Sequence, residues 1–276
     1  MCGRFSLFAD DEELVSLFDV DLLLGEHRPS FNVAPSQQVR VVMDRLADED
    51  GHTLRPTDVA DSPNAHVQRQ LRLLRWGLVP SWAKTPERPI INARAETLTT
   101  KPSFRSAAAR RRCLVPANGY FEWQQPPSGA GRKQPWFLSA GGGGATADAD
   151  EGDPVLALAG IFEAWRIPSS STDAGSHDDG TPSEWLLTCA IITRSAPDAL
   201  GEIHERTPVV VPPRAWNAWL DPRTTSSEEV EQMLRSIPDP HLVPRRVSTA
   251  VGNVRNDSPD LILPVGGNTP PGGPVG

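Results

Sequence analysis

Cys2 is the residue with the most distinctive chemistry in this chain, because removal of Met1 would make it the N-terminal residue. An N-terminal cysteine carries an α-amine and a thiol on one carbon skeleton. Their ordinary pKa values are about 7.7–8.0 and about 8.5, so both groups are partly unprotonated at neutral pH. Such an aminothiol can take an aldehyde as a Schiff base and then close a thiazolidine ring on it. Cys2 therefore predicts a covalent aldehyde trap, against the simpler interpretation of an incidental second residue.

The remaining cysteines and the histidines do not predict a metal site. Cys113 and Cys189 are far apart in sequence with no CxxC or CxxH spacing, and the six histidines form no HxH or HExxH cluster. Both cysteines lie in apolar segments, where a buried structural thiol is the ordinary case. We expect no metal, no cofactor and no disulfide.

The elements that must position Cys2 are mostly strands. Asp10 can cap a helix in which Leu14, Leu17 and Phe18 share one face, and Ser227 can cap another running through Val230 to Ile237. A short helix is expected near 214–220. Apolar runs bounded by Pro, Gly or Ser predict strands over 71–79, 155–165, 184–193 and 207–211. This mixture predicts an α+β fold with a mixed, barrel-like sheet and a few peripheral helices.

Three acidic segments interrupt the apolar pattern and read as loop insertions near 44–66, 141–153 and 167–184. The last two together hold eight acidic residues and no Lys or Arg, so without them the formal charge rises from −8 to 0. Without the first as well, the body of the chain is at +4. We expect one domain over 1–266 and a flexible Gly/Pro tail over 267–276. An acidic total does not exclude a nucleic-acid partner.

Six motifs carry a family resemblance. They are Met1-Cys2-Gly3-Arg4-Phe5, the NVAP run at 32–35, RWGLVPSW at 75–82, INARAE at 91–96, NGYFEW at 118–123 and IHERTP at 203–208. In this order the set resembles the SOS-response-associated peptidase (SRAP) family, whose members process abasic sites in DNA. The resemblance runs to the closing segments at 250–256 and 261–265, and it leaves out the acidic insertions.

The resemblance implies a catalytic set of Cys2, Asn92, Glu122 and His204. Cys2 would attack the aldehyde of a ring-opened abasic sugar, and the Asn92 amide would orient its amine. Glu122, between two aromatic residues, would lose hydration and hold a proton near neutrality. His204 would shuttle protons as the sugar opens. The alternatives without a catalytic role are a turn residue for Asn92, a solvent-facing strand residue for Glu122 and a surface or core histidine for His204.

The resemblance also implies DNA-binding residues. Arg4, Arg94 and Arg206 would contact phosphates, and Trp82 and Pro35 would stack or wedge against bases beside the lesion. The alternatives are ion-paired or solvated arginines, a core tryptophan and a turn proline. Asn32 would fix a loop near Cys2, and Asn118 stands where the motif usually has an acidic residue.

Three functions remain open. The first is a DNA-damage protein that crosslinks abasic sites in single-stranded DNA through Cys2, with β-elimination (lyase) and release of Met1, by the protein itself or by an aminopeptidase, as further activities. The second is an N-terminal-nucleophile amidohydrolase or cysteine peptidase. The third is a non-enzymatic single-strand binding module. The absence of an apolar spanning run or a signal segment predicts a cytoplasmic protein, nucleoid-associated when bound to damaged DNA, with no membrane partner. We also expect a monomer. The replication machinery stays open as a further partner.

Overall fold

The computed structural model describes residues 2–54, 62–126, 128–141, 154–168 and 185–266 of the 276-residue chain. Its strands are β1 Phe5–Leu7, β2 Leu22–Leu23, β3 Ser30–Val33, β4 Gln38–Ala47, β5 His66–Trp76, β6 Asn92–Arg94, β7 Arg112–Ala117, β8 Gly119–Gln124, β9 Gln134–Ser139, β10 Leu156–Arg166, β11 Trp185–Ser195, β12 Arg206–Pro208 and β13 Val243–Arg246. Its helices are α1 Asp11–Phe18, α2 Arg105–Arg110, α3 Asp198–Ile203, α4 Trp216–Leu220 and α5 Ser227–Ser236. Short 3₁₀ turns are η2 Ala95–Thr97, η3 Pro213–Ala215, η4 Thr249–Gly252 and η5 Pro259–Ile262.

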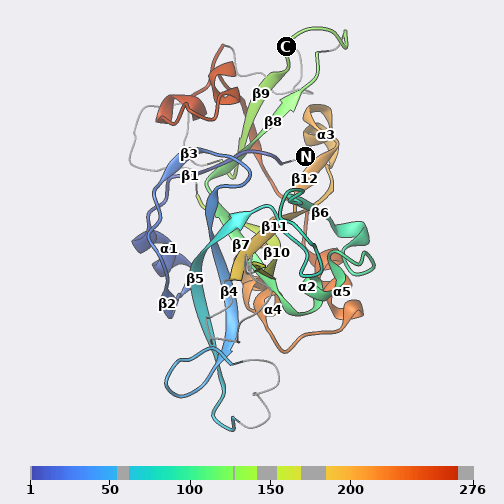
Figure 1. Ribbon diagram of the computed structural model, residues 1–276. Coiled ribbons are helices and arrows are strands. Elements are labelled where there is room, and N and C mark those ends of the chain that lie inside the picture. Colours follow the sequence, from blue (N-terminus) through green and yellow to red (C-terminus); the bar gives the residue numbers. More distant parts are fainter. Residues whose placement is uncertain (1, 55–61, 127, 142–153, 169–184, 267–276) are drawn as a thin grey trace, which may run out of the picture.

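A closed five-stranded barrel forms the centre of the molecule (Figure 1). Its strands follow one another in the order β5, β4, β7, β10 and β11, and every neighbouring pair along that path is antiparallel. The ring closes where β11 returns to β5 as a parallel pair, with Cys189 opposite Trp76. The predicted α+β fold with a mixed, barrel-like sheet is therefore confirmed.

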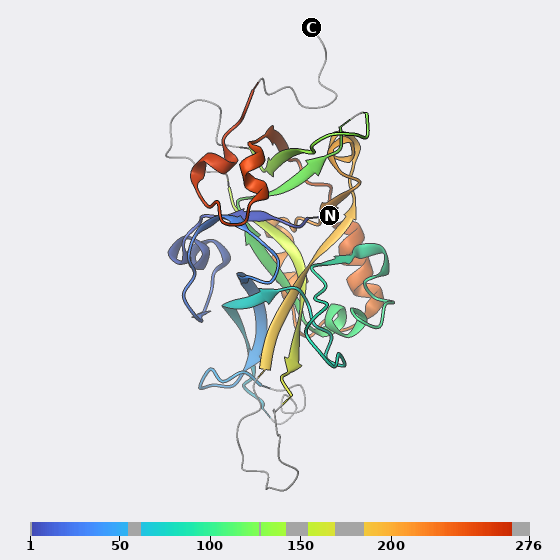
Figure 2. The ribbon, with the colours of Figure 1, turned by 45° about the horizontal axis from the view of Figure 1, so that its top comes forward.

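A second sheet crosses one end of the barrel in the order β13, β9, β8, β1 and β3. Its outer face has its own small apolar cluster of Phe121, Phe137, Val247, Val251 and Leu261. Figure 2 shows the red C-terminal turns η4 and η5 lying over this sheet. In Figure 1 the blue segment leading into β1 ends between the green β8–β9 pair and the orange α3.

Local sequence explains how several elements begin and end. The Asp10 carboxylate accepts a hydrogen bond from the Glu13 N–H at 2.9 Å, which caps α1 as predicted. Helix α5 is capped by Ser226 and not by Ser227, because the Ser226 hydroxyl accepts from the Glu229 N–H. The predicted strand over 71–79 begins earlier, at His66, and ends at Trp76. Gly77 then takes φ +132°, a conformation open to glycine, and Pro89 packs where a Cβ would lie.

The other sequence predictions of structure have mixed outcomes. The strands near 155–165, 184–193 and 207–211 and the helix near 214–220 are confirmed with shifted ends. Cys113 and Cys189 are both fully buried, as expected for structural thiols. The insertions over 141–153 and 167–184 and the tail over 267–276 lie almost wholly outside the described residues. No helix in the described part of the chain is long and apolar enough to cross a membrane.

Candidate active site

Strand β8 fixes the position of the N-terminal segment. Phe5 pairs with Tyr120 in an antiparallel register, and the Phe121 N–H donates to the Arg4 carbonyl at 2.9 Å. The chain therefore enters β1 alongside β8. Cys2, three residues before Phe5, is fully buried. A thiol two residues from the chain start is thus held inside the protein by strand pairing.

Asn92 contacts Cys2 directly. Its side-chain Nδ2 donates to the Cys2 carbonyl oxygen at 2.8 Å. Its strand, β6, pairs in parallel with β11, where Asn92 is opposite Ile191, and this pairing fixes its position. The Asn92 Oδ1 is also buried and accepts no hydrogen bond from the described residues. A donor on one side and an unused acceptor on the other suit an amide that orients a nearby amine.

Glu122 lies in the middle of β8, opposite Trp136 of β9, and its side chain is only 3% exposed. The solvent-facing alternative for Glu122 is therefore excluded by its burial. Burial raises the pKa of this carboxyl to about 7. A carboxyl that titrates near neutrality can both accept and return a proton under working conditions.

The Cys2 thiol has a raised pKa. Burial is the larger cause, and the negative charge of Glu122 is the second, which places the carboxylate near the sulfur. The partly ionised thiol expected from the ordinary pKa is therefore wrong for buried Cys2. The thiol stays protonated at neutral pH, and Glu122 is a nearby base for its proton.

His204 directly follows α3, and its N–H donates to the Leu200 carbonyl at 3.0 Å. The Arg206 N–H donates to the His204 Nδ1 at 3.0 Å, which places the proton of the neutral ring on Nε2. Burial lowers the pKa of His204, so the neutral ring is the main form at neutral pH. The charge of Lys133 affects both His204 and Glu122.

Arg4 is partly buried and bonded within the protein. Its guanidinium donates to the Asn32 Oδ1 at 2.8 Å and to the Val251 carbonyl at 2.9 Å. It also lies 6.0 Å from the centre of the Trp123 ring. Its predicted phosphate contact stays a prediction, and these two bonds join the Cys2 segment to β3 and η4.

Asn32 joins distant parts of the chain, as the sequence predicted for a loop-fixing residue. Its Nδ2 lies within hydrogen-bond distance of the carbonyl oxygens of Val251, Asn253 and Asn256, at 3.3, 3.1 and 2.7 Å. Together with its bond to Arg4, Asn32 connects β3, the Cys2 segment and the C-terminal turns.

Arg206 is 8% exposed and forms a bidentate ion pair with Glu96. Its two terminal nitrogens donate to the two carboxylate oxygens at 2.7 and 2.8 Å. It also donates to the Thr193 carbonyl at 2.6 Å. This ion pair lowers the pKa of Glu96 to about 2. The phosphate role predicted for Arg206 stays a prediction, but its guanidinium is already used inside the protein.

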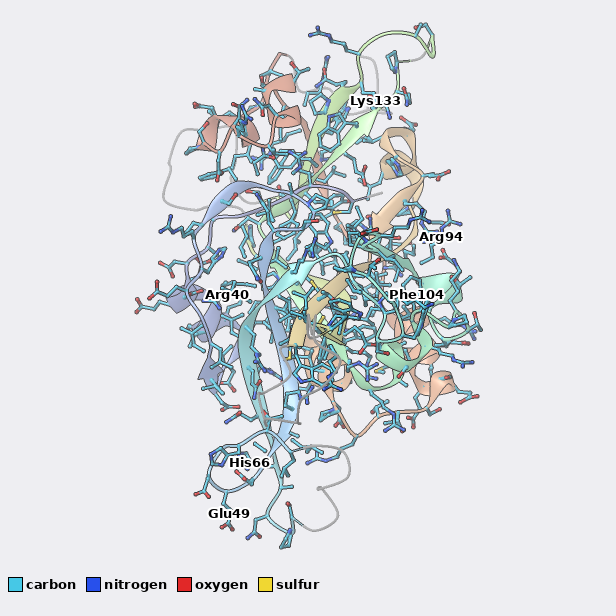
Figure 3. All side chains as sticks on the ribbon, viewed as in Figure 1. Arg40, Glu49, His66, Arg94, Phe104 and Lys133 are labelled. Atoms are coloured by element: carbon cyan, nitrogen blue, oxygen red, sulfur yellow. The ribbon has the colours of Figure 1, made fainter. Side chains whose placement is uncertain are left out.

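The other predicted DNA-binding residues lie at the surface. Arg94 is exposed on β6, two residues from Asn92, and Figure 3 labels it on the same side as α3. Trp82 is 66% exposed, so the core alternative for this ring is excluded. Pro35 is half-buried in a turn where the Ala34 N–H donates to the Gln37 side chain and Ser36 has φ 71°.

Sequence reasoning missed four residues around this site. The Tyr120 hydroxyl lies 2.9 Å from the Thr207 hydroxyl and ties β8 to β12, and burial raises the pKa of Tyr120. Glu96 holds Arg206, and Lys133 of the β8–β9 turn brings a positive charge to Glu122 and His204 (Figure 3). Tyr120, Glu96 and Thr207 lie inside three of the motifs, which was the only available signal. Lys133 lies outside them all.

The barrel and the crossing sheet define a single α+β domain, and it holds a buried cysteine at position 2 that Asn92 contacts. The chain matches the family described as SOS response associated peptidase (SRAP) over residues 1–254. It therefore belongs to the SRAP family.

Relatives and solved structures agree with this assignment. The chain is 32% identical over 266 residues to the abasic site processing protein YoqW of Bacillus subtilis, covering 95% of this chain and 99% of that protein. It is 31% identical over 256 residues to the abasic site processing protein HMCES of Gallus gallus, covering 87% of this chain and 68% of that protein. A crystal structure of a Bacteroides thetaiotaomicron protein has the same fold, with a TM-score of 0.64, 20% identity and coverage of 96% of this chain and all of that one.

Proposed function

We propose that this protein processes abasic sites in single-stranded DNA and crosslinks to them through Cys2 once Met1 has been removed. The observation that carries the proposal is the contact set of Cys2. It is buried, its carbonyl accepts from Asn92 and its thiol lies near the charge of Glu122. The names of the relatives, abasic site processing proteins, supply the substrate class.

The first step exposes the nucleophile. While Met1 is attached, the Cys2 nitrogen is an amide and cannot attack an aldehyde. Hydrolysis of the Met1–Cys2 bond, by the protein or by an aminopeptidase, consumes one water and yields free methionine and the Cys2 amine. The Asn92 Oδ1, which is buried and accepts from no described residue, then has a donor in that amine.

The second step forms the adduct. The Cys2 amine adds to the C1′ aldehyde of the open sugar, and loss of one water leaves a Schiff base. The thiol then adds to the same carbon, and its proton passes through Glu122 to the former imine nitrogen. The raised pKa of the thiol keeps sulfur protonated until that carbon is in place, and the Glu122 pKa of about 7 suits a transient proton carrier.

His204 and the surface residues complete the proposal. The neutral His204 carries its proton on Nε2 and can donate a hydrogen bond to the sugar ring oxygen, while the proton of the C1′ hydroxyl passes to that oxygen as the aldehyde opens. Arg94 binds phosphate, and exposed Trp82 stacks on a base beside the lesion. If a base removes the C2′ proton from the Schiff base before the ring closes, β-elimination follows and the strand breaks, which is the lyase branch.

A denaturing gel tests the proposal. Wild-type protein is incubated with labelled single-stranded DNA that carries one abasic site, and its intact mass is measured to establish that Met1 is absent. We expect a shifted band that survives denaturation without a reductant. Cys2→Ala, which keeps an amine but has no thiol, should give a band only after borohydride reduction.

The same assay separates the alternatives. An amidohydrolase or peptidase of other substrates gives no stable adduct with wild type. A binding module gives no denaturation-resistant band but shifts DNA on a native gel equally well with Cys2→Ala. Either result contradicts the proposal. Glu122→Gln purified with Met1 still attached would assign the removal of Met1 to the protein itself.

A further inference from the structure

A cavity of about 580 Å³ lies in the barrel wall between β4 and β10. It exists because β7, the strand between them, begins at Arg112, opposite Ile161. The last hydrogen bond on that side of β10 runs from the Phe162 N–H to the Arg111 carbonyl at 2.9 Å. Beyond it, the Ala164 N–H donates a hydrogen bond to the side-chain carboxylate of Glu163 at 3.1 Å. The two long strands therefore part without a described strand between them.

Four arginines line this cavity from two sides. Arg45 and Arg72 come from β4 and β5, and Arg110 and Arg111 come from the end of α2 and the residue after it. In the antiparallel register, Arg45 and Arg72 project from the same face of the β4–β5 pair, since Arg72 is opposite Val41. Guanidinium groups thus converge on one space from separate elements.

Each of the two carboxylates in the cavity wall already forms an ion pair with one arginine. Asp44 holds Arg69 through both oxygens at 2.8 and 2.9 Å. Glu163 holds Arg111 at 2.9 Å. This leaves the guanidinium groups of the other three arginines without an ion pair to any described residue.

Burial makes this arrangement unfavourable without an anion. The pKa of Arg45 is lowered by burial, then by the charges of Arg72 and Arg111. A guanidinium nevertheless stays protonated in proteins, so the cluster repels itself in a partly dehydrated space. A bound anion with several oxygens would relieve both the repulsion and the lost hydration.

Two aromatic side chains in the same cavity indicate an anion that also carries an aromatic group. The Arg45 guanidinium lies 5.9 Å from the centre of the Phe162 ring, and Trp185 at the rim is 55% exposed. An exposed indole beside arginines can stack on a nucleobase. The cavity volume falls within the range of about 300–1,000 Å³ that small-molecule sites occupy.

We propose that this cavity is a second ligand site that binds the phosphate groups of a nucleotide, with its base on Trp185. It lies apart from the Cys2 site. Trp76, at the end of β5, contacts Phe5 of β1, the strand that follows Cys2. Arg72 lies four residues earlier on β5, which is about 13 Å farther from β1. Figure 3 shows the far end of the β4–β5 hairpin, at Glu49 and His66, opposite the end that carries Lys133. The nucleotide is either free or part of a DNA strand.

Calorimetric titration with deoxythymidine triphosphate tests the site. We expect saturable binding to the wild-type chain and at least a tenfold loss of affinity in Arg45→Gln and in Arg72→Gln. Arg110→Gln, which changes an exposed side chain, should weaken binding without affecting the melting temperature. Arg105→Gln is the matched control, since Arg105 is exposed on the same helix but does not line the cavity. All four variants should keep wild-type crosslinking to abasic DNA.

Two further titrations identify the source and can overturn the proposal. Inorganic tripolyphosphate should bind at least several-fold more weakly than the nucleotide, and equal affinity would contradict a role for the base. A 12-residue oligothymidylate with a 5′-phosphate should compete with the triphosphate if the site takes a DNA strand and should not if it takes free nucleotides. Absence of saturable triphosphate binding, or an equal loss of affinity in Arg105→Gln, would refute the site.

Discussion

At the scale of single residues, burial decides the chemistry of the candidate site. The same loss of hydration raises the pKa of the Cys2 thiol, raises that of Glu122 to about 7 and lowers that of His204. Thiol and imidazole are therefore both neutral at neutral pH, and Glu122 is the group that changes charge there. This makes the carboxyl the expected proton carrier of the reaction.

Glu122→Gln should change the pH dependence of both rate and stability. The crosslinking rate of wild type should show an inflection near pH 7 that the variant lacks. Because the folded pKa is raised from 4.5, the contribution of Glu122 to stability is full below about pH 4.5 and is lost as pH rises through about 7. The variant should therefore gain up to about 3 kcal/mol over wild type at pH 8 and none at pH 4.5. Denaturant titrations at the two pH values check this, and an equal difference at both would contradict it.

Arg94 and Arg206 should separate DNA binding from stability. Arg94→Gln removes an exposed charge, so it should weaken binding of single-stranded DNA and reduce the slope of log affinity against log salt by about 0.7. Arg206→Gln breaks the pair with Glu96 and should lower the free energy of unfolding by about 1–3 kcal/mol. Salt titrations and thermal melts measure the two effects. A larger salt-slope change for Arg206→Gln than for Arg94→Gln would reverse these roles.

Motifs identified Cys2, Asn92 and Glu122, which the structure brings together, because each lies in a short polar and aromatic run. The same motifs could not show that the Arg206 guanidinium points inward, since Arg94 and Arg206 look alike in sequence. Burial depends on the neighbours that the fold supplies. For Arg206 that neighbour is Glu96, more than a hundred residues earlier in the chain.

At the scale of elements, the site depends on segments that meet only in the folded chain. Cys2 is held by β8 on one side and β6 on the other, and Asn32 of β3 joins Arg4 of the Cys2 segment to the C-terminal turns. The capped helices were predictable because their signals are local. The parallel closure of β5 on β11 was not, because it joins segments over a hundred residues apart and leaves no local signal.

Asn32→Asp should show how much the bonds from Asn32 to the C-terminal turns contribute to the free energy of unfolding. The aspartate keeps an acceptor for Arg4 but loses the Nδ2 donor that serves the carbonyls of 251, 253 and 256. Those acceptors, of which the Val251 carbonyl is buried, would face a carboxylate, so we expect a loss of about 1–3 kcal/mol in the free energy of unfolding. Asn64→Ala at an exposed position is the control. Urea unfolding measures both, and equal stabilities of the two variants would show that the connection is unimportant.

At the scale of the whole molecule, the net negative charge comes from two acidic segments of the sequence, and the rest of the chain has no net charge. The eight acidic residues of 141–153 and 167–184 equal the net charge of the chain. A chain in which both segments are replaced by short Gly-Ser loops should bind single-stranded DNA more tightly at low salt, because eight negative charges no longer repel phosphates. The gain should vanish near 1 M salt. Fluorescence anisotropy at several salt concentrations checks this, and a gain that persists at high salt would contradict an electrostatic cause.

The central claim is that Cys2, freed of Met1, forms a ring with the aldehyde of an abasic site. Mass spectrometry of the protease-digested adduct tests it most directly. The account predicts an N-terminal peptide that begins at Cys2 and carries the sugar remnant on both its nitrogen and its sulfur, so that the thiol no longer reacts with iodoacetamide. A remnant on any other residue, or an adduct whose Cys2 thiol remains free to alkylate, would contradict it.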